Sequence, residues 1–240
     1  KNAKRYNEEF ASILSELNGF MTRKAEFFKA RAYKSAEETI LGYPNDIICP
    51  EQLKGLPGIG EAVINKLREY VNTGKVKYLE QERNDPINVL TNVYGIGFKK
   101  AQSLVEEGID NIEKLKENKS KLNNVQQIGL QYYEPLLERI PRKEIDDYKK
   151  KMEVIFKTLP NHEDATFEIV GSYRRGAQNS GDIDVIITSV SNDKSIFEQF
   201  LNKLEQEKVI LEFLSKGKIK SLTIGKLNDE SKPRRLDFLY

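Results

Sequence analysis

Two aspartates, Asp182 and Asp184, occupy alternate positions in a β-branched run and are the residues best placed to do chemistry. Alternate residues of a strand face the same side, so the two carboxylates are expected about 6–7 Å apart on one face. Paired carboxylates suit hard divalent cations such as Mg²⁺. A turn at Gly171 and Ser172 and a basic stretch precede the aspartates, and both suit phosphate. This segment therefore predicts nucleotidyl transfer.

The composition favours a globular protein with two or more domains. The chain has 240 residues, of which 32% are charged and 38% hydrophobic, and its net charge is +2. With so small a net charge, binding to a polyanion must depend on local clusters of basic residues. Single copies of cysteine and histidine, Cys49 and His162, exclude a disulfide framework, a Cys/His zinc site and catalysis by a Cys–His pair. The apolar runs are of strand length, which predicts no transmembrane helix and no membrane partner.

The expected location is an intracellular, reducing compartment, because the sequence has one cysteine and no visible secretory signal. This means the nucleus in a eukaryotic cell and otherwise the cytoplasm, and a virus-encoded protein fits the same expectation. The chain begins at Lys1 and ends at Tyr240 within a strand-like run, so we interpret it as a fragment.

The periodicity of apolar residues predicts an α+β fold in which helices come first and a mixed β-sheet follows. The expected helices cover residues 7–42 (two helices), 61–72, 98–107, 111–137 and 143–159. The expected strands cover residues 166–170, 182–188, 219–224 and 234–240, with a helix near 195–207 between the second and third strands.

A Gly-Ile-Gly motif occurs twice, at Gly58–Gly60 and Gly95–Gly97, and each copy leads into an amphipathic helix. Such glycines let amides at a helix N-terminus approach a phosphate closely. Neighbouring carbonyls can also hold a monovalent cation that bridges to the phosphate. A helix end followed by a turn is the alternative interpretation of one such motif, but the internal repeat favours DNA binding. The two copies resemble helix-hairpin-helix motifs, which contact DNA phosphates without reading the sequence.

Lys66, in the helix after the first motif, lies between apolar residues. A lysine in this setting usually extends to solvent. A partly desolvated lysine instead has a lowered pKa and can attack an aldehyde to form a Schiff base. Lys29, Tyr33 and Lys34 are candidate phosphate and DNA contacts near it.

Together these motifs resemble the family X DNA polymerases over nearly the whole chain. Further segments that carry the resemblance are Arg139-Ile140-Pro141-Arg142, Leu214-Ser215-Lys216-Gly217 and Arg234-Arg235-Leu236-Asp237. The resemblance implies a lyase-like DNA-binding domain over residues 1–82 and a duplex-binding subdomain over residues 83–142. Residues 143–240 would form a nucleotidyltransferase palm, incomplete here, with the thumb subdomain missing.

In the palm, the resemblance implies a site for two Mg²⁺ ions held by Asp182, Asp184 and Asp237. The implied reaction adds dNMP to a primer 3′-hydroxyl in gapped or nicked DNA. Arg235 is an expected DNA contact. The residues that match dNTP-binding positions are Arg139, Ser172, Arg175, Ser180 and Gly181.

In the helical region, the resemblance makes Lys66 the nucleophile that removes a 5′-deoxyribose phosphate during base excision repair. The backbones that match ligands of a monovalent cation, Na⁺ or K⁺, are those of Lys54, Leu56, Ile59, Thr91, Val93 and Ile96. Phe28, Ala62 and Tyr78 depart from basic residues found in the family. The loss of positive charge is expected to weaken binding of the 5′-phosphate and therefore lyase activity.

Two other functions remain open on the sequence. One is a non-catalytic module that binds DNA gaps or ends, and the other is a nucleotidyltransferase that works without a template. Because the thumb is missing, the 240 residues are expected to bind DNA and metal but to polymerise poorly, and to act as a monomer.

Overall fold

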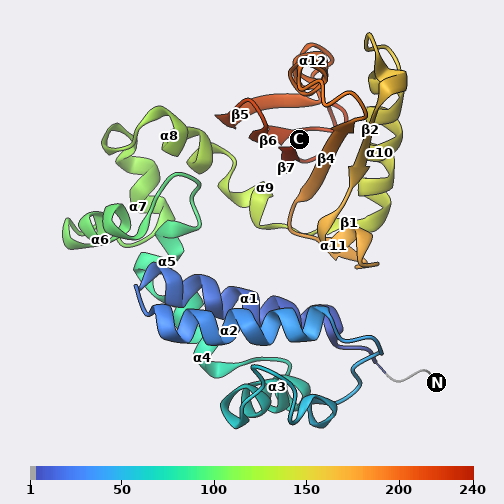
Figure 1. The fold of residues 1–240 in the computed structure, drawn as a ribbon. Helices are drawn as coiled ribbons and strands as arrows, with labels where there is room; N and C mark the ends of the chain where they lie inside the picture. The colour runs from blue at the N-terminus through green and yellow to red at the C-terminus, as the bar shows by residue number, and fades with distance from the viewer. Residues whose placement is uncertain (1–3) are drawn as a thin grey trace. The chain divides into compact units, whose positions relative to one another are not determined.

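The structure, a computed structural model, describes residues 4–240 (Figure 1). The chain folds into two compact units, Lys1–Lys119 and Ser120–Tyr240. The three domains expected from the sequence, with boundaries after residues 82 and 142, stay a prediction. No helix in the described part of the chain is both long enough and apolar enough to cross a membrane.

The first unit is helical throughout its described residues, as the sequence predicts. Its helices are α1 (Asn7–Arg23), α2 (Phe27–Leu41), α3 (Glu61–Thr73), α4 (Lys77–Asn84), α5 (Pro86–Thr91), α6 (Phe98–Glu106) and α7 (Ile112–Glu117), with a 3₁₀ turn at Pro50–Leu53. Helices α1 and α2 pack along each other (Figure 1).

The core of the first unit follows from the helical spacing of apolar residues. Phe10, Leu14 and Leu17 lie three or four positions apart in α1 and are fully buried. Phe10 and Leu14 share a cluster with Leu67 of α3, which fixes α3 and the turn before it against the α1–α2 pair.

The second unit combines helices with a five-stranded sheet. Its helices are α8 (Asn124–Gln131), α9 (Tyr133–Leu137), α10 (Arg142–Phe156), α11 (Gly171–Arg174) and α12 (Ser195–Gln206), with 3₁₀ turns at Lys119–Lys121 and His162–Asp164. Its strands are β1 (Ile140–Pro141), β2 (Ala165–Ile169), β3 (Asn179–Ser180), β4 (Ile183–Ser189), β5 (Ile210–Lys216), β6 (Lys220–Gly225) and β7 (Arg234–Leu239).

The sheet order is β2-β4-β7-β6-β5, and only the β4–β7 pair is parallel. Ile183 and Val185 of β4 and Phe238 of β7 are buried in one cluster with apolar residues of α10 and α12, so these helices cover one face. Successive residues of a strand face opposite sides, which leaves Asp184 and Asp237 on the other face. The mixed sheet and the preceding helices confirm the α+β class.

The structure differs from the sequence prediction at several elements. Helices α4 and α5 were not predicted. Strand β5 was missed, because register shifts between Ile210 and Glu212 and between Phe213 and Ser215 interrupt the alternation that marks a strand. The single helical region expected at 111–137 is divided into α7, a 3₁₀ turn, α8 and α9. Asn123 is the N-cap of α8 and begins a new helix there. In this capping box its side chain accepts a hydrogen bond from the backbone amide of Gln126.

Candidate active site

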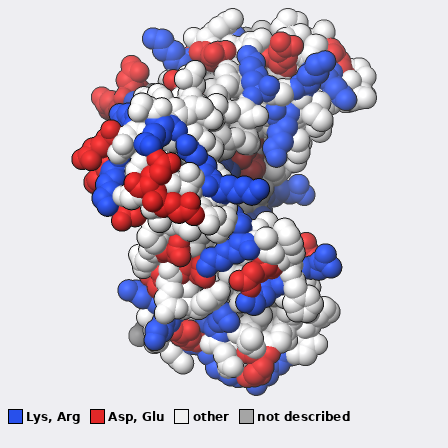
Figure 2. All heavy atoms as spheres, turned by 90° about the vertical axis from the view of Figure 1, so that its left-hand side faces the viewer, with Lys and Arg blue, Asp and Glu red and all other residues white. Residues whose placement is uncertain are grey.

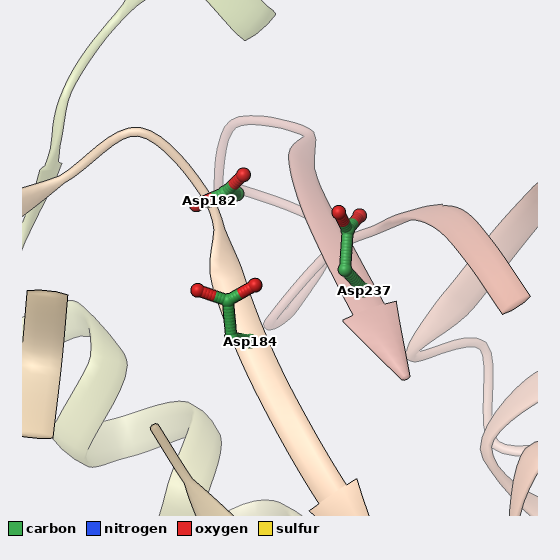
Figure 3. Close-up of side chains that lie close together, drawn as sticks. All are labelled: Asp182, Asp184 and Asp237. Atoms are coloured by element: carbon green, nitrogen blue, oxygen red, sulfur yellow. The ribbon is translucent and has the colours of Figure 1, made fainter. Parts of the chain in front are cut away.

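Three aspartates meet on the face of the sheet opposite α10 and α12. One carboxylate oxygen from each of Asp182, Asp184 and Asp237 lies within 4.8 Å of the other two (Figure 3). Asp184 and Asp237 are direct neighbours in the parallel β4–β7 pair, and Asp182 comes just before β4. The structure therefore brings together the three aspartates predicted from the sequence, although they lie on two separate segments.

The electrostatics of the cluster favour a cation. Burial, together with the charges of Asp182 and Asp237, raises the pKa of Asp184 to about 6. The pKa of Asp237 is also raised, chiefly by burial, although Arg235 opposes the shift. Three carboxylate oxygens are the hard donors that Mg²⁺ prefers, so the residues present fit a divalent ion.

Arg235 donates hydrogen bonds to two of these three carboxylates. Its Nη2 donates to Asp182 Oδ2 at 2.5 Å and to Asp237 Oδ2 at 3.0 Å, and its Nε donates to Asp237 Oδ1 at 3.1 Å. Burial lowers the pKa of Arg235, but the carboxylates outweigh burial and raise it. Arg235 thus offsets part of the negative charge, and its predicted DNA contact stays a prediction.

The first residue of the one-turn helix α11 has to be glycine. Gly171 begins the one-turn helix α11 with φ 63°, and a Cβ atom there would collide with the carboxylate of Asp184. The Val170 amide donates to the Asp184 backbone carbonyl at 2.9 Å, which ties this turn to the strand. A side chain at position 171 would therefore displace Asp184.

Four of the five predicted dNTP-binding residues form two contacting pairs. Ser172 Oγ donates to Ser180 Oγ at 2.7 Å. Arg139 lies beside Gly181, whose Cβ position would be 3.4 Å from Arg139 Nη1. The fifth, Arg175, is exposed, and its positive charge opposes part of the rise in the pKa of Asp184, which places that charge near the cluster.

Sequence reasoning missed the residues that hold these groups in place. Asn179 accepts from Arg139 Nε at 2.8 Å through Oδ1 and from Nη2 at 3.0 Å through its backbone carbonyl. Arg142 Nη1 donates to the carbonyls of Tyr173 and Ala177 at 2.7 and 3.3 Å, which fixes the loop after α11. The Arg-Ile-Pro-Arg motif at 139–142 could have indicated the role of Arg142 from the sequence, whereas no sequence pattern indicated the role of Asn179.

Arg234, next to Arg235, has a structural role. It is 5% exposed and forms a two-pronged ion pair with Glu144 of α10, with Nε–Oε1 and Nη2–Oε2 distances of 2.7 and 2.8 Å. Alternation along β7 therefore sends one arginine to the helical layer and the next to the carboxylates.

The two Gly-Ile-Gly turns have matching geometry in the first unit. Gly58 and Gly95 have φ of 75° and 85°, in the left-handed region. Gly60 and Gly97 cap α3 and α6 with φ/ψ of −90°/172° and −85°/172°, and nothing lies within 4 Å of their Cβ positions. No side chain caps either helix, so both N-termini are open to an anion.

The backbones predicted to hold a monovalent cation lie in these turns and repeat the same hydrogen bonds. Ile59 N donates to Leu56 O at 3.1 Å, and Ile96 N donates to Val93 O at 3.0 Å. Lys54 and Thr91 occupy equivalent positions just before each turn. Cation binding there stays a prediction.

Lys66 is half-buried and lies between two aromatic rings. Its Nζ is 5.9 Å from the ring centroid of Tyr33 and 5.7 Å from that of Tyr78. Within the described residues Lys66 has no acidic partner, so its amine is not held in an ion pair. Burial, with a contribution from Glu82, raises the pKa of Tyr78 to about 12, so this phenol stays neutral.

The predicted phosphate-binding lysines of α2 are paired with acidic neighbours. Lys29 Nζ lies 2.5 Å from Glu26 Oε2, and Lys34 Nζ lies 3.1 Å from Glu37 Oε2. Both lysines are exposed and would have to exchange a carboxylate for a phosphate. Figure 2 shows basic and acidic side chains intermixed on the face drawn, as expected for a net charge of +2.

The chain matches three family models in sequence order. Residues 5–76 match a helix-hairpin-helix domain, residues 88–137 the fingers domain of DNA polymerase lambda, and residues 139–240 the DNA polymerase beta palm. DNA polymerase lambda of Arabidopsis thaliana is 31% identical over 215 residues, which is 87% of this chain and 40% of that protein. The type-X family protein pol4 of Schizosaccharomyces pombe is 26% identical over 207 residues, 84% of this chain and 40% of that protein.

The fold and the carboxylate site define a nucleotidyltransferase palm preceded by helix-hairpin-helix elements. The chain belongs to the family X DNA polymerases. It spans about two fifths of the length of the curated relatives that it matches.

Proposed function

We propose that this protein is a DNA polymerase that fills short gaps during repair. The observation that carries this proposal is the meeting of three carboxylates on two neighbouring strands. The type-X relatives named as DNA polymerases support the same reaction class. The proposed substrates are gapped or nicked DNA and a dNTP.

In this proposal Asp182 and Asp184 hold divalent ions and Asp237 shares one of them. Two Mg²⁺ ions, when bound, would activate the primer 3′-hydroxyl and stabilise the leaving pyrophosphate. The bond from the 3′-oxygen to the α-phosphorus forms, and the bond from that phosphorus to the bridging oxygen breaks. Asp237 would accept the hydroxyl proton, directly or through the coordination shell of the metal, a role supported by its place beside Asp184 in the β4–β7 pair.

The triphosphate is proposed to bind beside the carboxylates. Arg139 and Arg175 would offset its charge as hydrogen-bond donors. Ser172, Ser180 and the exposed backbone at Gly181 would contact its oxygens. The hydrogen bond between the two serines and the closeness of Arg139 to Gly181 support this assignment.

A second proposed activity is removal of a 5′-deoxyribose phosphate by Lys66. Its amine would attack the sugar aldehyde, and the resulting carbinolamine would lose water to form an imine. Loss of the C2′ proton and cleavage of the C3′–O bond would release the DNA strand with a 5′-phosphate, and water would then hydrolyse the imine to free the sugar phosphate and the lysine. The half-buried amine without an acidic partner supports the nucleophile role. The two Gly-Ile-Gly turns would hold DNA phosphates, each with a Na⁺ or K⁺ ion. The protein would act as a monomer within the cell compartment that contains its DNA, the nucleus in a eukaryote.

A gap-filling assay of the full-length protein tests the proposal. We expect incorporation of the templated nucleotide into a one-nucleotide gap, and its loss when EDTA removes the divalent ion. Addition of all four nucleotides regardless of the template would favour the template-independent transferase. Tight binding to gapped DNA without any incorporation would favour the non-catalytic module.

A further inference from the structure

An open depression of about 360 Å³ lies along helix α1 and includes Asn92, which comes shortly before the second Gly-Ile-Gly turn. One face of α1 forms most of it, because residues three or four positions apart lie on the same side of a helix. The lining residues are Ser12, Ser15, Glu16, Gly19, Phe20, Arg23 and Asn92.

Arg23 has unused hydrogen-bond donors at one end of this depression. Within the described residues its guanidinium donates to no acceptor, and its Nε is both inaccessible to solvent and unpaired. The guanidinium lies over the Phe20 ring, 4.8 Å from the centroid. Burial lowers the pKa of Arg23. A desolvated guanidinium without an acceptor is unfavourable, and an oxyanion bonded to it would offset that cost.

The other polar groups of the depression also favour an anion. The side chains of Ser12, Ser15 and Asn92 form no hydrogen bond within the part of the chain that the structure describes. Glu16 is the acidic residue of the lining, and Arg83 holds both of its carboxylate oxygens at 2.7 Å. The depression therefore offers hydroxyl, amide and guanidinium donors, and its carboxylate is already paired.

We propose that this depression binds a phosphate group of a DNA strand. The proposal rests on the DNA-binding function proposed above and adds a phosphate subsite to it. A guanidinium pairs with two phosphate oxygens at once, and serine hydroxyls complete the contact. Asn92 lies three residues before Gly95 of the second Gly-Ile-Gly turn, so a strand held at that turn would continue over α1.

The test measures binding of a one-nucleotide gapped duplex by the 240-residue chain over a range of salt concentrations. Arg23→Gln removes the cation, and Ser15→Asp adds a negative charge at an exposed helix position. We expect each change to weaken binding about tenfold. Arg23→Gln should also reduce the slope of log affinity against log salt by about 0.9, the value for one phosphate contact.

Arg5→Gln is the matched control. It also removes one cation, but Arg5 pairs with Asp46 and precedes the start of α1, whereas Arg23 is at the far end of this helix, about 24 Å along it. Its affinity and salt slope should equal those of the unchanged chain. In parallel, the ¹⁵N resonance of Arg23 Nε, assigned by its loss in Arg23→Gln, should shift when the duplex is added.

The outcomes separate this inference from the proposed function. Unchanged affinity and slope in both variants, with normal DNA binding, would overturn the subsite and leave the function standing. A shift of the Arg23 resonance by inorganic phosphate alone, with no effect of either variant on DNA, would make this a free-anion site and overturn the DNA assignment. If no variant and not even the unchanged chain binds DNA, both proposals fail.

Discussion

Replacing Asp184 by alanine is expected to abolish nucleotide incorporation by the full-length protein and to leave its affinity for gapped DNA nearly unchanged. We expect a loss of at least about 10³-fold, because removal of a single transition-state hydrogen-bond donor already costs 10²–10³-fold. Asp184 has the central place in the cluster, since its pKa is raised to about 6 by burial and by both other aspartates. Single-turnover incorporation measures the effect.

Asp184→Asn and Glu168→Gln make this experiment specific. Asp184→Asn keeps the shape of the side chain and should be as inactive as the alanine variant. Glu168 is an exposed carboxylate on β2, and its strand position pairs with Ile186 of β4 rather than with an aspartate. Glu168→Gln should therefore keep full activity. Turnover by Asp184→Ala at the rate of the unchanged protein would contradict the two-metal assignment.

Replacing Lys66 by arginine or alanine is expected to prevent borohydride trapping on DNA with an incised abasic site. Borohydride reduces the imine between an amine and the sugar aldehyde to a stable secondary amine, so the trapped adduct reports the nucleophile. The Lys66 amine lies between the rings of Tyr33 and Tyr78 and has no acidic partner in the described chain. A gel that resolves the protein–DNA adduct measures the result.

Lys66→Arg is the more informative variant, because it keeps the positive charge and removes the nucleophile. It should bind the DNA as the unchanged chain does and still give no adduct. Lys75→Ala, at an exposed position just after α3, should trap normally. Undiminished trapping by Lys66→Arg would show that another amine attacks the aldehyde.

The sequence predicted those parts of the site that lie within one segment. Alternation placed Asp182 and Asp184 on one face because a strand repeats every two residues. The twin Gly-Ile-Gly turns were also visible, since only glycine readily adopts the positive φ found at Gly58 and Gly95. In both cases the information lies within a few neighbouring residues.

The remaining parts depend on contacts between distant segments. Periodicity could not show that β7 lies parallel to β4 with Asp237 opposite Asp184, and that pairing completes the carboxylate cluster. The bonds from Arg235 to two aspartates follow from the same pairing. Strand β5 was not predicted because its register shifts interrupt the alternation of apolar and polar residues by which a strand is recognised in a sequence. Resemblance to a family supplied Asp237, where local pattern alone did not.

Direct binding of Mn²⁺, followed by electron paramagnetic resonance of the 240-residue chain, tests the central claim that these aspartates form a divalent metal site. At neutral pH we expect binding to the unchanged chain that weakens strongly in Asp182→Asn, Asp184→Asn and Asp237→Asn. The raised pKa of Asp184, about 6, means that protons compete with the metal below that pH, so affinity should fall about tenfold at pH 5. Equal Mn²⁺ binding by the unchanged chain and all three variants would contradict the account.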